Sequence, residues 1–311
     1  MPSNRMLRRV ALVASMVVLA GSCSLQPPPS SDAVALLETG PRTVTSEADA
    51  APPADVETTQ RPPSRDSSEP VETQPPVEQT YWRVGASPLP LRPDGLGEIQ
   101  PTPQELVDRR LPTTSTLPAP AADDYVATSA VVPADVLERS TWHPGCPVGS
   151  EELRYLTLSF WGFDGGHHTG EMLVHADVAD AVIEVFGALH AERFPIEEMR
   201  VTAAWELDTA PTGDGNNTSA FVCRSAVGMG RWSDHASGLA VDINPFVNPY
   251  VRSDGVVIPE LASAYTDREH RRDGMILEGG IVTDAFDAVG WTWGGRWASP
   301  LDLMHFSATG G

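Results

Sequence analysis

Hydrophobic residues follow regular patterns only in the second half of the chain. Between residues 153 and 160, β-forming residues alternate partly with polar ones and predict a strand. Gly165 and Gly166 mark a turn, and residues 171–174 predict a returning strand. Apolar residues then recur at helical spacing over 177–194, with Asp177 as a suitable N-cap. The pattern therefore predicts a hairpin followed by a helix.

The remaining pattern predicts short strands, a loop and one more helix. The expected strands lie at 199–205 and 239–243, the loop at 208–219, the helix at 281–289 before Gly290, and a return to the sheet over 291–306. Strands mixed with two helices in no regular βαβ order favour an α+β fold.

Composition divides the chain into parts. Of the 29 prolines, 21 precede residue 136, and the accompanying Ser, Thr, Ala and Glu leave little apolar surface to bury. We expect residues 24–136 to form a disordered, acidic, Pro-rich linker. Residues 137–311 are enough for one sizeable core and form the predicted domain.

The N-terminus has the pattern of an export signal. Basic residues precede an apolar run over 10–20 that is too short to span a bilayer, and small residues follow. The run ends in Leu-Ala-Gly-Ser-Cys, which resembles a lipobox with Cys23 as the lipidated residue. Residues 1–23 therefore predict an exported protein, anchored by lipid on the outer face of the cytoplasmic membrane or secreted to the cell wall.

Lipidation of Cys23 would leave two cysteines. Cys146 and Cys223 are then candidates for a disulfide in an oxidising compartment, with two separate buried thiols as the alternative.

Charge excludes several classes of function. A net charge of -21 argues against a nucleic-acid partner, because binding to polyphosphate needs a basic face. Arginine supplies all 21 positive charges, so Schiff-base lysines, lysine bases and P-loop lysines are excluded.

A histidine and an aspartate stand seven positions apart around a predicted buried strand. His235 lies in a loop, and Asp242 lies within the apolar run 239–243. A buried carboxylate needs a paired charge, hydrogen bonds or a metal. A metal site and a carboxylate bonded only to the backbone both satisfy this requirement.

Asp302 and His305 form a second pair near the C-terminus. Catalytic zinc commonly has three ligands from His, Asp and Glu, with a fourth position for water. His235, Asp242 and His305 would fill this set. Asp302 would then be free to move a proton between water and a leaving amine, although a structural pairing with an arginine is the alternative.

The two motifs together resemble those of a known family. Ser-x-His-x-x-Gly-x-Ala-x-Asp, followed by Glu or Asp-x-x-His, is typical of the D-alanyl-D-alanine carboxypeptidase family of zinc peptidases. That family includes the vancomycin-resistance dipeptidases and the L-alanyl-D-glutamate endopeptidases of phage. The matching residues are Ser233, His235, Gly238, Ala240, Asp242, Asp302 and His305. The resemblance covers about residues 140–311.

The resemblance implies a small antiparallel sheet with packed helices, zinc as the cofactor and peptidoglycan stem peptides as substrate. It implies zinc ligands at His235, Asp242 and His305, and a general base at Asp302. Ser233 would support the ligands from behind. Arg224, or less well Arg231, would steady the substrate carbonyl, with a surface ion pair as the alternative for Arg224.

The resemblance does not decide which bond is cleaved, because carboxypeptidases of the family usually have Glu where this chain has Asp302. Aspartate at this position is usual in the endopeptidases of the family, so the resemblance favours L,D-endopeptidase over D,D-carboxypeptidase action. A zinc-containing wall-binding module without turnover is the alternative function, whereas a structural zinc site would usually have four Cys or His ligands.

Two other groups of residues are ambiguous. We expect His167 and His168 to lie in a turn rather than bind metal. The tryptophans Trp291, Trp293 and Trp297 fit a substrate groove and a core position equally well.

Overall fold

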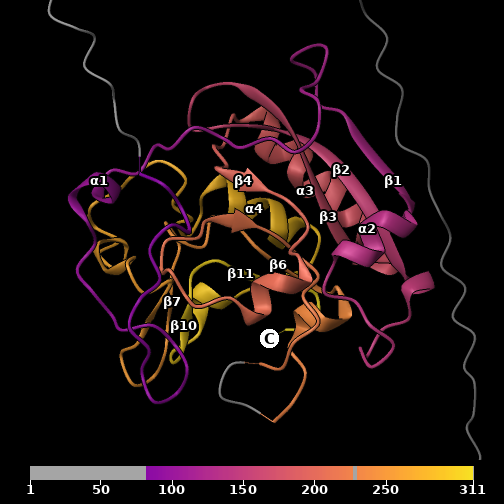
Figure 1. The fold of residues 1–311 in the computed structure, drawn as a ribbon. Helices are drawn as coiled ribbons and strands as arrows, with labels where there is room; N and C mark the ends of the chain where they lie inside the picture. Colours follow the sequence, from indigo (N-terminus) through magenta and orange to yellow (C-terminus); the bar gives the residue numbers. More distant parts are fainter. Residues whose placement is uncertain (1–81, 227–229, 311) are drawn as a thin grey trace, which may run out of the picture. The chain divides into compact units, whose positions relative to one another are not determined.

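The computed structural model describes residues 82–226 and 230–310, shown as a ribbon in Figure 1. In chain order the elements are α1 (Gln104–Val107), β1 (Ala127–Val131), α2 (Ala134–Arg139), β2 (Leu153–Trp161), β3 (His167–His175), α3 (Ala179–Ala191), β4 (Glu198–Met199), β5 (Asn217–Thr218), β6 (Ala240–Asp242), β7 (Tyr250–Val251), β8 (Val257–Ile258), α4 (Ile281–Ala288), β9 (Thr292–Trp293), β10 (Leu301–Asp302) and β11 (His305–Ser307). The predicted signal at 1–23 and the first part of the predicted linker lie outside the described residues. Within the described part, no helix has the length and apolarity needed to cross a membrane.

The fold mixes helices with small antiparallel sheets, as the α+β prediction requires. The prediction of one small sheet is wrong, however. The described residues form three three-stranded sheets, β1-β2-β3, β10-β7-β8 and β6-β11-β9, and the two-stranded parallel pair β4-β5. Strands of only two or three residues carry too short an alternation for a sequence pattern to separate one sheet from another.

The predicted hairpin is the longest regular feature. β2 and β3 pair antiparallel over nine residues each, from Leu153 opposite His175 to Trp161 opposite His167. Gly165 adopts φ +72° in the connecting turn, a conformation that favours glycine. The hairpin is confirmed, and its second strand is longer than the predicted 171–174.

The predicted helix differs at both ends. Asp177 is not its N-cap, because a 3₁₀ turn at Ala176–Val178 comes first and the Asp177 amide donates to His175 Nδ1 at 3.2 Å. α3 ends at Ala191, since Arg193 turns the chain with φ +53°. The predicted strand at 199–205 is also wrong. Only Glu198–Met199 forms a strand, Ala203 makes an isolated bridge with Ser140, and a 3₁₀ turn occupies Ala204–Asp208.

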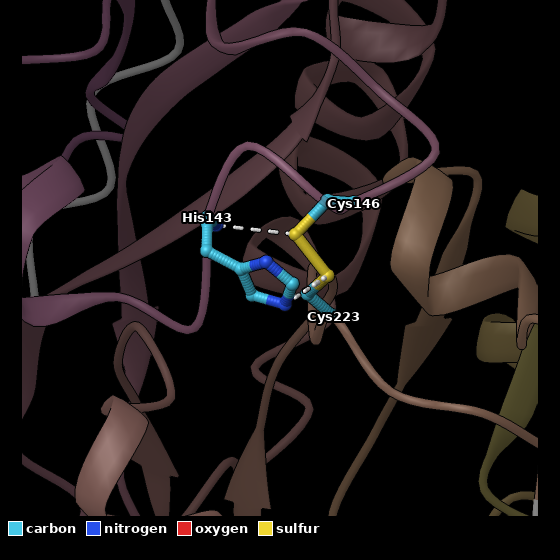
Figure 2. Close-up of side chains that lie close together, drawn as sticks. All are labelled: His143, Cys146 and Cys223. Carbon is cyan, nitrogen blue, oxygen red and sulfur yellow. Dashed lines mark hydrogen bonds between the residues drawn. A yellow bond between two sulfur atoms is a disulfide. The ribbon is translucent and has the colours of Figure 1, made fainter.

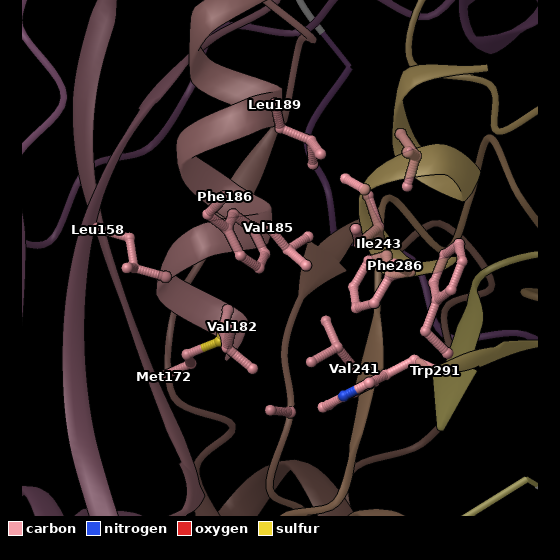
Figure 3. Packing of buried hydrophobic residues seen from close by; sticks show 14 of the residues in the cluster. Leu158, Met172, Val182, Val185, Phe186, Leu189, Val241, Ile243, Phe286 and Trp291 are labelled. Carbon is pink, nitrogen blue, oxygen red and sulfur yellow. The ribbon is translucent and has the colours of Figure 1, made fainter. Parts of the chain in front are cut away.

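The main core forms where α3 packs against the hairpin on one side and α4 on the other. Figure 3 shows Val182 and Phe186 of α3 beside Met172 of β3, with Phe286 of α4 facing the same interior. Trp291 and Trp293 also belong to this core and are each 5 % exposed. This position excludes both from a substrate groove.

The segment 82–136 packs on the domain, so the predicted domain boundary at residue 137 is wrong. β1 pairs with β2, and Leu106 of α1 is fully buried. Arg109, with a fully buried side chain, forms a bidentate ion pair with Glu197, and its Nε atom lies 2.6 Å from Glu197 Oε2. A few anchor residues among prolines fix this arm, and average composition does not reveal them.

Candidate metal centre

His235 and His305 reach one site from different elements. His305 lies on β11 directly opposite Asp242 on β6, so both side chains leave the sheet on the same face. His235 lies on a 3₁₀ turn at Asp234–Ser237 that leads into β6. Gly238 ends this turn with φ +68°, and a Cβ there would lie 2.6 Å from the His175 amide nitrogen. Only glycine fits this position, which explains the motif glycine.

The three side chains meet at ligand distances. His235 Nε2 lies 3.2 Å from His305 Nδ1 and 3.1 Å from Asp242 Oδ2, and His305 Nδ1 lies 3.1 Å from Asp242 Oδ1. Four ligands about 2.0–2.1 Å from a tetrahedral zinc lie about 3.3 Å from one another. The residues therefore fit a zinc-like cation. In the described residues only one other group, His143, Cys146 and Cys223, brings three potential ligands together.

The tautomer of His235 and the charge of Asp242 also favour a cation shared by the three side chains. His235 Nδ1 lies 2.6 Å from the Ala220 carbonyl oxygen and donates to it, so in the neutral ring Nε2 is left with a lone pair. That lone pair faces the Asp242 carboxylate and the second imidazole. Burial raises the pKa of Asp242, but His235 and His305 lower it more, and the net pKa lies well below its usual range. A positive charge between these atoms is thus stabilised.

Asp302 lies at the end of β10 with its Oδ1 atom buried and without a hydrogen-bond partner in the described structure. Burial and then the charge of Asp242 raise its pKa to about 7, against smaller opposite effects of His305 and Arg224. No ion pair joins Asp302 to any described arginine, so the alternative of a structural pairing is not observed. A carboxyl group with this pKa exchanges protons readily near neutral pH.

A cavity of about 170 Å³ opens over the three candidate ligands. Its lining includes Arg224, Arg231 and Ser233, together with Asp302. Arg224 Nη1 donates to the Ser225 carbonyl at 3.3 Å and forms no ion pair with a described carboxylate. The structure thus places the three candidate ligands, Asp302, Ser233 and both candidate arginines around one cavity.

Trp297 is the one member of the tryptophan trio that lines the cavity, with its ring centroid 5.6 Å from that of His305. Tyr250, Ile258 and Met304 also line it and were not predicted. Isolated apolar and aromatic residues carry no spacing signal, so no pattern in the sequence indicated these three.

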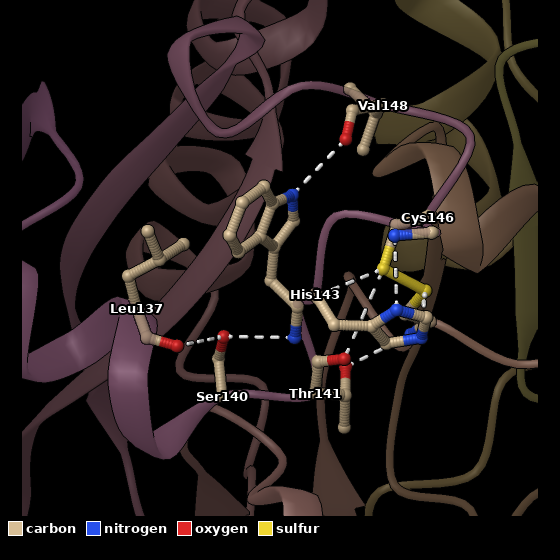
Figure 4. Close-up of a disulfide and its surroundings, with 9 residues drawn as sticks. Leu137, Ser140, Thr141, His143, Cys146 and Val148 are labelled. Atoms are coloured by element: carbon tan, nitrogen blue, oxygen red, sulfur yellow. Dashed lines mark hydrogen bonds between the residues drawn. A yellow bond between two sulfur atoms is a disulfide. The ribbon is translucent and has the colours of Figure 1, made fainter.

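A disulfide joins Cys146 to Cys223, the residue before Arg224, with Cα atoms 5.8 Å apart (Figure 2). The alternative of two separate thiols is therefore not observed. His143 lies beside the sulfurs, and Thr141 Oγ1 accepts from the Cys223 amide at 2.9 Å (Figure 4). Because both sulfurs are bonded to each other, this second group does not fit a metal. The disulfide instead holds the chain immediately before Arg224.

The paired histidines of the hairpin have other partners. His167 Nε2 lies 2.8 Å from His190 Nε2 of α3, and His168 Nε2 lies 3.1 Å from Asp164. His167 and His168 are the first residues of β3 rather than part of the turn. Neither belongs to a group of three potential ligands in the described structure.

A larger hollow of about 660 Å³ lies elsewhere, between the arm at Trp82 and the loop carrying Trp205. Three of its charged side chains pair with one another, since Arg200 binds both Glu198 and Glu206. The smaller cavity has the three facing candidate ligands and the Asp302 carboxyl group, and it is the one equipped for chemistry.

Comparison with known proteins agrees with this geometry. Residues 227–308 match the family model for D-alanyl-D-alanine carboxypeptidase. The resemblance inferred from the two motifs is thereby confirmed, and the match indicates a hydrolase of the peptidase type. No curated protein and no solved structure matches the chain.

The segment matched to the D-alanyl-D-alanine carboxypeptidase family contains His235, Asp242, Asp302 and His305. Arg224 lies just outside it. The family match therefore covers the candidate ligands and base, whereas the arginine rests on its position in the cavity wall.

Proposed function

We propose that the protein is an exported, zinc-dependent peptidase that hydrolyses peptide bonds in peptidoglycan stem peptides. The observation that carries the proposal is the meeting of His235, Asp242 and His305 at 3.1–3.2 Å in a cavity that the carboxyl group of Asp302 also lines. Two imidazoles and one carboxylate leave a fourth tetrahedral position open, as catalytic zinc sites do. The family match supports peptidase action.

Zinc bound by these three residues would supply Lewis-acid polarisation of the scissile carbonyl and make water a stronger acid. Asp302 then accepts a proton from the attacking water and passes it to the leaving amine nitrogen. Burial and the Asp242 charge raise the pKa of Asp302 to about 7 in the metal-free protein, so this carboxyl group can hold a proton in the cavity.

Arg224 stabilises the negative charge that develops on the carbonyl oxygen during attack. Its guanidinium lies in the cavity wall and is free of described carboxylate partners. Arg231 lines the same cavity but is more exposed, and it is the weaker candidate for this role. Ser233 directly precedes the turn that carries His235. Its amide donates to the Arg224 carbonyl at 3.2 Å and so links this turn to the segment of the candidate arginine.

Export accounts for the remaining features of the chain. A signal at 1–23 with Cys23 as a lipid attachment point would leave the Pro-rich residues before 82 as a tether to the membrane. The disulfide between Cys146 and Cys223 supports an oxidising location such as the outer face of the membrane or the wall.

Hydrolysis of defined muropeptides tests the proposal directly. The zinc-loaded protein should release a fragment that mass spectrometry identifies. Removal of metal with EDTA should stop release, and added zinc should restore it. Asp302→Ala should abolish release while zinc content stays at one ion per chain, because Asp302 is not a ligand.

The products also separate the alternatives. Free D-alanine means carboxypeptidase action, and a cut after L-alanine means the endopeptidase action that Asp302 favours. Zinc binding and wall binding without any product would instead identify a binding module. Unchanged turnover in Asp302→Ala would reject the assigned base.

A further inference from the structure

Asp234, the residue before His235, links two parts of the proposed metal site. Its Oδ2 atom accepts hydrogen bonds from Ser307 Oγ at 2.7 Å and from Thr309 Oγ1 at 2.5 Å. The Thr309 amide in turn donates to Ser307 Oγ at 3.1 Å. One carboxylate oxygen thus joins the turn that carries His235 to the end of β11, two residues beyond His305. We call these three residues the hydroxyl clamp.

The two histidines are held by unequal restraints. His305 is fixed to Asp242 by the pairing of β11 with β6. His235 lies on a turn outside that pairing, where its carbonyl accepts from the Val222 amide and its ring donates to the Ala220 carbonyl. Both bonds tie His235 to the segment before the turn rather than to β11. The hydroxyl clamp supplies the side-chain link to β11 itself.

We propose that Asp234 is a positioning residue which, through Ser307 and Thr309, presets the distance between His235 and His305 for the cation. The inference rests on the proposed metal site. Ligand distances in metal sites are constrained to within about 0.2 Å, and partners behind the ligands commonly change metal affinity 10–100-fold when removed. Asp234 is adjacent to His235, and Ser307 lies two residues after His305. The hydrogen bond between them therefore restrains the distance between the two histidines.

Zinc affinity of the full chain, measured by competition with a chromogenic chelator, tests the clamp without reference to turnover. The double variant Ser307→Ala/Thr309→Val keeps the Asp234 charge but removes both donors, and it should bind zinc about 10-fold more weakly or worse. Asp234→Ala should lose at least as much. Asp234→Asn, which keeps an acceptor oxygen, should recover most of the affinity lost in Asp234→Ala.

Combining the changes isolates the clamp. Asp234→Ala added to the double hydroxyl variant should weaken binding no further, to within about twofold, because all three residues act through the same bonds. Asp164→Ala is the matched control, since one Asp164 carboxylate oxygen likewise accepts two hydrogen bonds, from the Gly166 amide and from His168 Nε2, but in the β2–β3 turn. Its zinc affinity should equal that of the unchanged protein.

Three outcomes would overturn the inference. If the hydroxyl variant binds zinc normally while both Asp234 variants bind weakly, charge rather than position is responsible. If every clamp variant lowers the melting temperature of the metal-free protein but leaves zinc affinity unchanged, the clamp is only structural. If the losses add in full, the bonds do not form one unit. Absence of zinc binding by the unchanged protein would instead reject the proposed metal site.

Discussion

The raised pKa of Asp302 predicts how the stability of the metal-free protein depends on pH. Burial and then the Asp242 charge raise the pKa from 3.8 to about 7. A carboxyl group with a raised folded pKa binds its proton more tightly in the folded state than in the unfolded state. Its stabilising effect is full below the unfolded pKa and is lost as pH rises through 7.

The size of the effect follows from the two pKa values. The difference between about 7 and 3.8 is about three pH units, and each is equivalent to 1.36 kcal/mol. Asp302 should therefore destabilise the metal-free protein by up to about 4 kcal/mol above pH 7 relative to pH 4. Asp302→Asn removes the titrating proton but keeps the shape. Its stability relative to the unchanged protein should therefore rise by about 3 kcal/mol between pH 5 and pH 8, which covers the last two of these three pH units.

Urea unfolding in EDTA, followed by tryptophan fluorescence at pH values from 5 to 8, measures the difference in unfolding free energy. Asp287→Asn is the control, because hydrogen bonds from Arg296 lower the pKa of Asp287, and its ionisation is complete by pH 5 in both states. That variant should differ from the unchanged protein by a constant amount. A pH-independent difference for Asp302→Asn as well would refute the explanation by burial and neighbouring charge.

Two further predictions concern the restraints on the domain. Arg109→Met should lower the unfolding free energy by about 3–5 kcal/mol in urea titrations, because it leaves Glu197 buried without its partner. The neighbouring Arg110→Met, which breaks only an exposed pair, should change it by less than about 1 kcal/mol; equal effects would contradict this account of the arm. Replacing Cys146 and Cys223 by serine should lower stability by about 2–5 kcal/mol, since their bond closes a loop across 77 positions. Dithiothreitol should lower the melting temperature of the unchanged protein but leave that variant unaffected, and a shift in both would exclude the disulfide as its cause.

Long periodic segments were predictable from the sequence, and short ones were not. The β2–β3 hairpin and α3 each repeat their apolar period several times, and both were located within a few residues. β4 has two residues and owes its extended shape to pairing with β5, which lies 18 residues further along the chain. The arm before residue 137 was missed because Leu106 and Arg109 act singly, through contacts with distant residues.

The candidate ligands were predictable because chemistry restricts their residue types and order. The groups that hydrogen-bond to His235 and to Asp234 could not be predicted from the sequence. The Ala220 carbonyl that orients His235 belongs to the backbone, and every residue has one. Asp234 stands inside the motif, but its partners Ser307 and Thr309 are hydroxyl residues of a kind found throughout the chain. Ser307 comes close to Asp234 because β11 pairs with β6, the strand that follows the turn, and no local pattern in the sequence records that pairing.

The same pairing explains why the family-matched segment depends on the rest of the domain. Residues 227–308 carry all the candidate ligands and the candidate base. Yet Val241 and Phe306, which alternate with the ligands on β6 and β11, pack into a core that also contains Met172 and Phe186 from outside the segment. Without β3 and α3 these apolar side chains would face water, and the strand pairing that sets the ligand distances would lose its support. The chemistry therefore resides in the matched segment, whereas its geometry is a property of the whole domain from the arm onward.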